Sequence, residues 1–310
     1  MKIQIYKPHF RTTFYEDDNS FTFINPEIRN LVQILEKNNE VELLSPSDRE
    51  FKHITNPDLK ILFNGRLYFK DDSGDELVKK ERKEISEIFD NSTKQYHFIT
   101  DWKIAKRNED FTSDFKFNDI TTTNKYYIDG ELEKVFLYNS PLVKNNDQKS
   151  RIIYIGNKRG NTRDDDLNKY LTTDMIDLFG NWDKEKFPTS QGPLKFSESQ
   201  EKISEYKYGL CLTEDLYVDK GHRTPRIWEY FRAGTYAFMD YKYPHEFDLI
   251  NSNDFRKVDS ADELKTKIKY LESNPYLYEK EIQKQFDKIN VTHFSGEHML
   301  KHLERIFRLE

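Results

Sequence analysis

Short apolar runs separated by amphipathic stretches recur along the whole chain. In the first half they predict β-strands at residues 1–6, 41–44, 59–63 and 96–100. The first of these runs alternates Ile with polar residues, so we expect it to form an edge of a first sheet. Two amphipathic stretches, at 25–35 and 79–89, predict helices between the strands.

The first predicted helix carries start signals as well as periodicity. Asn25 can cap it, Pro26 suits its first turn and Glu27 complements the helix dipole. Its apolar stripe is formed by Ile28, Leu31, Ile34 and Leu35. Alternation of strands with such helices is typical of a parallel α/β sheet.

The second half of the chain repeats this rhythm. One more strand of the first half is predicted at 135–138, and the strands of the second half are predicted at 151–155, 175–179, 208–212 and 236–239. Helices are predicted at 164–171, 197–205, 226–232, 261–273, 276–287 and 296–309. The segment 144–149 between the two halves is polar and without periodicity, which favours an interdomain linker. Two α/β halves meeting at a cleft are the expected result.

Composition narrows the classes of protein. Charged residues make up 34% of the chain, yet the net charge is −6 and the sequence pI about 5.9, which argues against a simple nucleic-acid-binding module. No apolar run approaches the roughly 20 residues that span a bilayer, and the N-terminus lacks a secretion signal. The single cysteine, Cys211, lies in an apolar run and is expected to be reduced and buried. We therefore expect a cytoplasmic protein.

The first candidate for chemistry is the turn after the strand at 151–155. It carries Gly156, Arg159 and Arg163, and a helix follows. Glycine permits close approach of the backbone to a phosphate, and two arginines could pair with a pyrophosphate. An ordinary strand–turn–helix connection with solvated arginines would give the same pattern.

The second candidate is the helix that begins after Pro225. Arg226 and Glu229 lie one turn apart on the same face, so the arginine could bind a diphosphate and the glutamate a ribose. A surface ion pair is the alternative. Trp228 and Phe231 on the same helix favour burial, which disfavours a fully solvated helix.

The third candidate is Asp101, which directly follows the strand at 96–100. Ligands of open α/β sheets bind beyond the carboxyl ends of the strands, where a carboxylate could act as a general base. A helix cap or loop aspartate is an equal alternative. A run of three aspartates at 164–166 invites a metal site, but acidic residues in the first turn of a helix have a sufficient electrostatic explanation.

Together, these motifs resemble the bacteriophage DNA β-glucosyltransferases, GT-B enzymes that glucosylate 5-hydroxymethylcytosine in DNA. The family has a strand–Gly–x–x–Arg–x–x–x–Arg turn, a later Arg–x–x–Glu helix, and an aspartate after a Phe-x-Thr strand end. The matching residues here are Gly156, Arg159, Arg163, Arg226, Glu229 and Asp101. By register, Leu194 and Tyr217 would lie near the uracil and the nucleoside.

The resemblance covers most of residues 96–290 and weakens before residue 90. Where the family has a glycine-rich first loop, which borders the acceptor pocket, this chain has Lys-Pro-His-Phe-Arg at 7–11. The implied fold is GT-B, with Rossmann-like domains at 1–145 (acceptor) and 146–290 (nucleotide sugar) facing across a cleft. The helix at 291–310 could cross back to the first domain.

The resemblance also implies an activity. The chain would transfer glucose from UDP-glucose, with inversion, to the hydroxyl of a 5-hydroxymethyl pyrimidine in double-stranded phage DNA, and Asp101 would be the base. No cofactor would be required, although Mg²⁺ or Mn²⁺ could bind on the donor diphosphate. Two alternatives stay open: transfer to a glycan or other small acceptor, and a non-catalytic nucleotide-sugar- or DNA-binding relative.

Overall fold

The chain divides into two compact units in the computed structural model. They comprise Met1–Asn139 with His293–Glu310, and Ser140–Thr292. The structure describes residues 1–7, 26–44, 56–63, 76–89, 93–99, 119–122, 126–128, 131–133, 145–158, 160, 162–171, 174–194, 196–215, 218, 226–243, 255–291 and 296–307. The strand predicted at 135–138 lies outside these residues.

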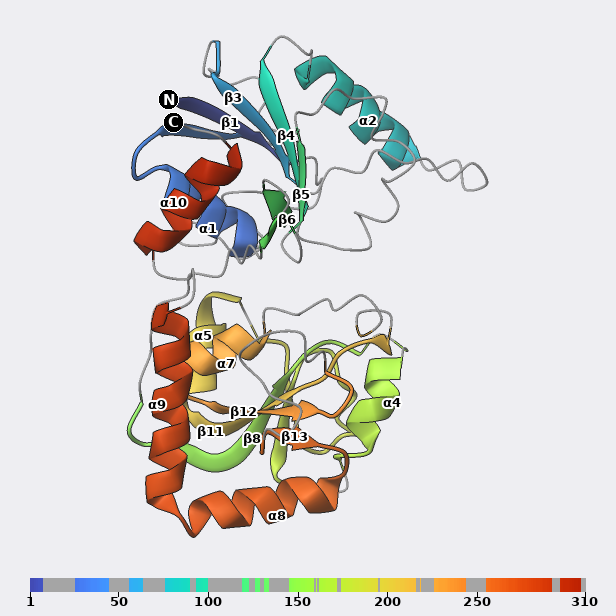
Figure 1. The fold of residues 1–310 in the computed structure, drawn as a ribbon. Helices are drawn as coiled ribbons and strands as arrows, with labels where there is room; N and C mark the ends of the chain where they lie inside the picture. The colour runs from blue at the N-terminus through green and yellow to red at the C-terminus, as the bar shows by residue number, and fades with distance from the viewer. Residues whose placement is uncertain are drawn as a thin grey trace. The chain divides into compact units, whose positions relative to one another are not determined.

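The first unit is built on a five-stranded parallel sheet (Figure 1). Its order is β2-β1-β3-β4-β5, and the strands are β1 (Lys2–Tyr6), β2 (Glu40–Leu44), β3 (Leu59–Phe63), β4 (Lys94–Ile99) and β5 (Asp119–Thr122). A separate antiparallel hairpin joins β6 (Tyr126–Ile128) to β7 (Glu131–Glu133). The helices of this unit are α1 (Pro26–Leu35), α2 (Glu76–Ile88) and α10 (Gly296–Phe307).

The expectation that the first strand lies at a sheet edge is wrong. β1 pairs with β2 on one side and with β3 on the other, so it is an interior strand. Its polar residue Gln4 is buried and donates a hydrogen bond from Nε2 to Oε2 of Glu42, 3.0 Å away on β2. The polar residue that suggested a solvent-exposed edge position is instead buried, because it is paired with a polar residue on the neighbouring strand.

The core of the first unit confirms the predicted stripe of α1. Ile28, Leu31, Ile34 and Leu35 are all buried in one cluster with the sheet. The last helix, α10, lies beside α1 and contributes to the same cluster (Figure 1). Its Phe307 ring packs edge-on against Tyr96, with ring centroids 5.2 Å apart. The first unit therefore combines the two ends of the chain in one core.

The second unit contains a six-stranded parallel sheet with the order β10-β9-β8-β11-β12-β13. The strands are β8 (Lys149–Ile155), β9 (Ile176–Phe179), β10 (Ser190–Gly192), β11 (Tyr206–Cys211), β12 (Tyr236–Asp240) and β13 (Lys257–Val258). The helices are α4 (Thr162–Asn168), α5 (Phe196–Ser204), α7 (Arg226–Arg232), α8 (Ala261–Glu272) and α9 (Pro275–Val291). The predicted α/β alternation is confirmed in both units.

The end of the predicted linker, at 144–149, is part of the second unit rather than a structureless connection. The Gln148 amide donates to the carbonyl oxygens of Ser204, Tyr206 and Gly234 at 3.1–3.2 Å. Its Oε1 accepts from the Tyr278 hydroxyl at 3.1 Å, and β8 begins at the next residue. The polar composition was misleading here because Gln148 satisfies buried backbone groups.

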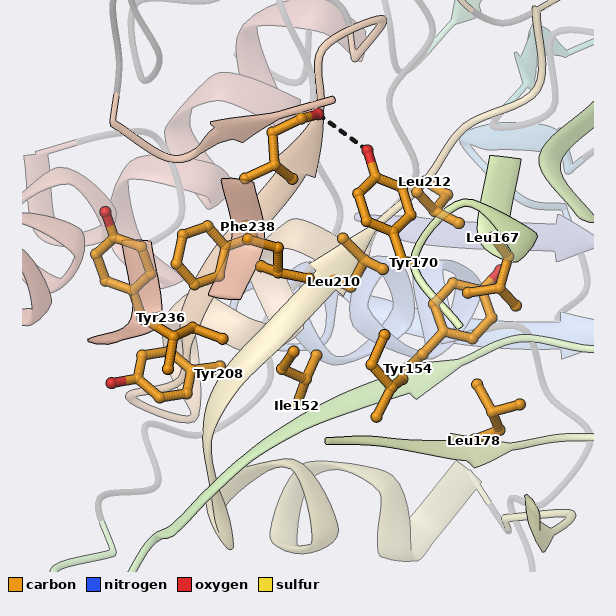
Figure 2. Close-up of a cluster of buried hydrophobic side chains, with 14 of the residues drawn as sticks. Ile152, Tyr154, Leu167, Tyr170, Leu178, Tyr208, Leu210, Leu212, Tyr236 and Phe238 are labelled. Atoms are coloured by element: carbon orange, nitrogen blue, oxygen red, sulfur yellow. Dashed lines mark hydrogen bonds between the residues drawn. The ribbon is translucent and has the colours of Figure 1, made fainter. Parts of the chain in front are cut away.

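Tyrosines fill much of the second core (Figure 2). Tyr154, Tyr170, Tyr208, Tyr236 and Tyr278 belong to this cluster together with Ile and Leu side chains. The Tyr170 hydroxyl lies 2.7 Å from Oδ2 of Asp240 and 2.9 Å from the Val258 carbonyl oxygen. Cys211 is buried and forms no disulfide, as expected, and burial raises the pKa of its thiol.

Candidate functional site

The order of strands in the second sheet defines where a ligand should bind. The chain leaves β8 towards β9 and β10 on one side, and then returns to add β11 on the other side of β8. This reversal creates a crevice at the carboxyl ends of β8 and β11, the usual ligand site of open α/β sheets. Gly156 directly follows β8, and Thr213 follows the end of β11.

The turn at Gly156 is tightly held from the neighbouring strand. Its N–H donates to the Phe179 carbonyl oxygen at 2.9 Å, and its own carbonyl oxygen accepts from Nε1 of Trp182 at 2.6 Å. Gly180 has a φ of +139°, and a Cβ there would lie 2.3 Å from the Gly156 oxygen. Gly180 must therefore be a glycine for these two turns to approach each other.

Arg163 lies on α4 beside this turn. Its NH2 group donates to the Asn157 carbonyl oxygen at 2.6 Å, and it is 3.8 Å from Oδ1 of Asp164. Its Nε is buried and has no hydrogen-bond partner within the part of the chain that the structure describes. A buried guanidinium N–H without a partner has unused capacity to bind an anion.

The aspartates at the start of α4 have internal roles. Oδ2 of Asp164 accepts from the N–H of Gly160 at 2.5 Å, which closes the turn. Asp166 is buried and pairs with Lys169 and Lys242. Across the described segments, no group of three or more His, Cys, Asp or Glu side chains is arranged to hold a metal ion.

Arg226 and Glu229 form an ion pair one turn apart at the start of α7. The pair is not a solvated surface contact, because Glu229 is only 4% exposed. Trp228 and Phe231 are buried on the same helix, as predicted. The arginine predicted to bind a diphosphate and the glutamate predicted to bind a ribose are thus in direct contact.

The sheet fixes the position of α7 through Tyr230. This hydroxyl lies 3.1 Å from the carbonyl oxygen of Ile153 on β8 and 3.4 Å from that of Leu210 on β11. A Cβ on Gly209 would lie 2.7 Å from the Tyr230 ring, so the glycine makes room for this contact. The start of α7 is therefore held over the two strands that border the crevice.

Tyr154 connects the two halves of the site electrostatically. Burial raises the pKa of its hydroxyl to about 12, while the charges of Arg163 and Arg226 act to lower it and that of Asp164 to raise it. Both guanidinium groups thus act on one hydroxyl. From the sequence, Tyr154 is part of the apolar strand predicted at 151–155, and its place two residues before Gly156 is the signal that could have pointed to the site.

The remaining predicted residues are only partly described. Leu194, which was expected to lie near the uracil, follows the edge strand β10 and is half-buried. Asp101, Arg159 and Tyr217 lie outside the described residues. The structure therefore brings Gly156 and Arg163 together in one turn, and Arg226 and Glu229 together on one helix.

The fold is that of GT-B glycosyltransferases. A structure of the DNA-modifying enzyme β-glucosyltransferase, with and without uridine diphosphoglucose, has a TM-score of 0.72 and 18% identity over 99% of this chain and 100% of that one. The T4 phage enzyme with UDP and Mn²⁺ has a TM-score of 0.68 and 16% identity over 99% of each chain. Sucrose-phosphate synthase from Thermosynechococcus elongatus has a TM-score of 0.59 and 9% identity over 100% and 99%.

Comparisons of the amino-acid sequence itself find no relative. No protein-family model matches the chain, and no curated protein matches it. The similarity to phage DNA β-glucosyltransferase, noted from three short motifs, extends over nearly the whole length of both folds. None of the described helices is long and apolar enough to cross a membrane.

Proposed function

We propose that this chain is a glycosyltransferase that uses a UDP-sugar, most simply UDP-glucose. One observation supports this most directly: an arginine on α4 and an Arg–Glu pair on α7 flank the crevice of a GT-B fold. In this proposal Arg163 and Arg226 bind the diphosphate together with Arg159. Glu229 binds the ribose, and Leu194 and Tyr217 border the nucleoside.

The proposed reaction is a direct displacement with inversion. An acceptor oxygen attacks the anomeric carbon of the sugar while the bond from that carbon to the diphosphate oxygen breaks. Asp101 takes the acceptor proton, and UDP leaves with the bonding electron pair, stabilised by the arginines. No protein-bound metal is required; Mg²⁺ or Mn²⁺ could bind on the diphosphate, as the T4 phage structure with UDP and Mn²⁺ suggests.

The proposed acceptor is a 5-hydroxymethyl pyrimidine in double-stranded phage DNA, modified in the cytoplasm of the host. The similarity in fold to a DNA-modifying β-glucosyltransferase supports this choice. Such a base would have to leave the helical stack for its hydroxyl to reach Asp101. A glycan or small acceptor is the second candidate, because the net charge of −6 suits it better and sucrose-phosphate synthase shares the fold.

The decisive experiment offers the protein UDP-glucose and three DNAs, containing cytosine, 5-hydroxymethylcytosine or 5-hydroxymethyluracil. Released UDP and the masses of digested nucleosides are measured. A hexose gain on one hydroxymethylated base identifies a DNA glucosyltransferase and its acceptor. UDP binding without a gain on any DNA would refute the DNA acceptor and direct the search to glycans, and UDP binding without release on any acceptor would indicate a non-catalytic relative.

The role of Asp101 has its own test. Asp101→Asn keeps the size of the side chain and removes the base, so the transfer rate should fall by about 10²- to 10⁴-fold. The affinity for UDP should stay unchanged. A variant that transfers at the full rate would exclude Asp101 as the base.

A further inference from the structure

The Tyr154 hydroxyl borders the turn at Gly156. A Cβ on Gly156 would lie 3.1 Å from this hydroxyl oxygen and 3.3 Å from the ring. Because residue 156 has no side chain, the Tyr154 ring and hydroxyl can lie directly against the backbone of the turn at the carboxyl end of β8. A ligand that approaches the backbone of this turn would meet the hydroxyl there.

Tyr154 is only 3% exposed, and none of the hydrogen bonds among the described residues involves its hydroxyl; the oxygen is not one of the fully enclosed polar atoms, so it keeps contact with solvent. Two other buried tyrosines of this unit are bonded within the protein. The Tyr208 hydroxyl donates to Oε1 of Glu272 at 2.7 Å, and the Tyr206 hydroxyl to Oδ2 of Asp177 at 2.9 Å. Most buried tyrosine hydroxyls bond within the protein, so one that makes no such bond beside a candidate site is available to a ligand.

Two further polar atoms of this unit have unused capacity to form hydrogen bonds. The Nε of Arg163 and Oγ1 of Thr213, which follows β11, are both buried and without partners in the described part of the chain. Each can donate a hydrogen bond. Three donors, on β8, on α4 and just after β11, fit a ligand with several acceptor oxygens, such as a diphosphate.

We propose that the Tyr154 hydroxyl donates a hydrogen bond to a diphosphate oxygen of the bound donor and to the same oxygen in the departing UDP. This inference rests on the proposed function and adds a catalytic residue to it. The bond strengthens as negative charge builds on the leaving diphosphate, so it stabilises the transition state more than the bound donor.

The chemistry of a buried tyrosine suits this role. Burial raises the pKa of the Tyr154 hydroxyl to about 12, so it keeps its proton and acts as a donor at neutral pH. A neutral hydroxyl binds an anion without adding a further charge to a crevice that already holds two arginines. T-shaped packing against Trp182, with ring centroids 6.2 Å apart, fixes the ring without using the hydroxyl.

The test uses Tyr154→Phe, which keeps the ring and removes only the oxygen. Binding of UDP and of uridine is measured by calorimetry, and unfolding by urea. UDP affinity should fall about 10- to 100-fold, the effect of losing one hydrogen bond to a charged group. Uridine lacks the phosphates, so its affinity should not change. The free energy of unfolding should not fall, because no bond within the protein is lost.

Tyr208→Phe is the matched control. It removes a buried hydroxyl from the same core, but one that is bonded to Glu272. We expect this variant to lose stability and to bind UDP as the unchanged protein does. The kcat of sugar transfer should fall in Tyr154→Phe and not in Tyr208→Phe.

Three results would overturn the inference. Equal UDP affinity in Tyr154→Phe and the unchanged protein would exclude the bond while leaving the proposed function intact. A loss of stability like that of Tyr208→Phe would mean that the hydroxyl has a partner within the protein. If the unchanged protein binds no UDP, the proposed function fails, and this inference fails with it.

Discussion

The two units share one architecture but fill their cores with different side chains. The main core cluster of the first unit consists, in its described residues, of Ile, Leu and Phe with a single tyrosine, Tyr96. The corresponding cluster of the second unit contains five tyrosines. An aliphatic core specifies shape and volume alone, whereas each buried hydroxyl also requires a polar partner.

The difference shows how a chain with only 36% hydrophobic residues can build two cores. Tyrosine adds a large apolar ring, and its hydroxyl can join elements that are distant in sequence. Tyr208 on β11 is tied to Glu272 on α8, and Tyr170 is tied to Asp240 on β12. The Tyr154 hydroxyl, next to the proposed donor site, forms no such connection to another described residue.

The largest expected effect is that of alkaline pH on the second unit. Burial raises the pKa of Tyr154, Tyr170, Tyr208, Tyr230 and Tyr278. Their stabilising effect is fully present below the pKa of an unfolded tyrosine, about 10, and is lost as the pH rises above it. Each tyrosine that stays protonated in the folded state should lower the free energy of unfolding by about 1.4 kcal/mol per pH unit.

Urea unfolding of a Trp102→Phe variant measures this loss. Its remaining tryptophans, Trp182 and Trp228, both belong to the second unit. The midpoint should be nearly constant from neutral pH to about pH 9 and then fall steeply. A midpoint that stays constant to about pH 11 would contradict the argument.

Shortening Phe307 to Ala tests the claim that the first core depends on volume. Phe307 is fully buried and packs against Tyr96 and Phe98. The substitution should lower the free energy of unfolding by about 3–5 kcal/mol, as loss of a buried ring usually does. Lys301→Ala on the exposed face of the same helix should change it by less than about 0.5 kcal/mol. A similar effect of both changes would mean that α10 is not part of this core.

The Arg226→Met variant tests whether a charged side chain of the second unit binds the diphosphate of UDP. UDP affinity should fall by about 10- to 100-fold, because one charged hydrogen bond to the diphosphate is lost. Arg151→Met is the control: it removes an arginine from β8 that pairs with Asp177. It should reduce stability and leave UDP affinity unchanged. Equal UDP affinities of the two variants would remove Arg226 from the site.

The smallest expected change in stability comes from the hydrogen bonds of Gln148, near the start of the second unit. Gln148→Leu removes the amide that serves three carbonyl groups and the Tyr278 hydroxyl. The free energy of unfolding should fall by about 1–2 kcal/mol. The exposed Gln191→Leu should have no measurable effect. An equally neutral Gln148→Leu would mean that water replaces the amide without loss.

The regular elements could be predicted from sequence because apolar periodicity reports burial directly. Leu59–Phe63 was predicted with the bounds that β3 has, and the stripe of α1 is buried throughout. Predictions failed where a polar residue has a distant partner. The sequence pattern predicts a solvent-facing Gln4, but this residue is buried because its amide bonds to Glu42. The pattern also predicts that Gln148 is a linker residue, but its amide bonds to carbonyl groups that lie far along the chain.

Parts of the candidate site could also be predicted, because glycine and paired arginines have a recognisable spacing. Arg226 and Glu229 lie one turn apart and pair, as the helix period requires. Tyr154 could not be predicted in this way. A tyrosine on a strand can simply pack in the core or can donate a hydrogen bond to a ligand, depending on what lies next to its hydroxyl. Only the fold shows that the Tyr154 hydroxyl lies beside Gly156.

The position of α10 has a consequence for how the protein is made. The first unit begins with β1, but its core also needs Leu300, Leu303 and Phe307 from the far end of the chain. On a ribosome, the whole second unit is synthesised before those residues emerge, and domains generally fold as they appear. The unit that is started first is thus completed last, and until then the surface of α1 that α10 will cover is open to chaperones or to other chains.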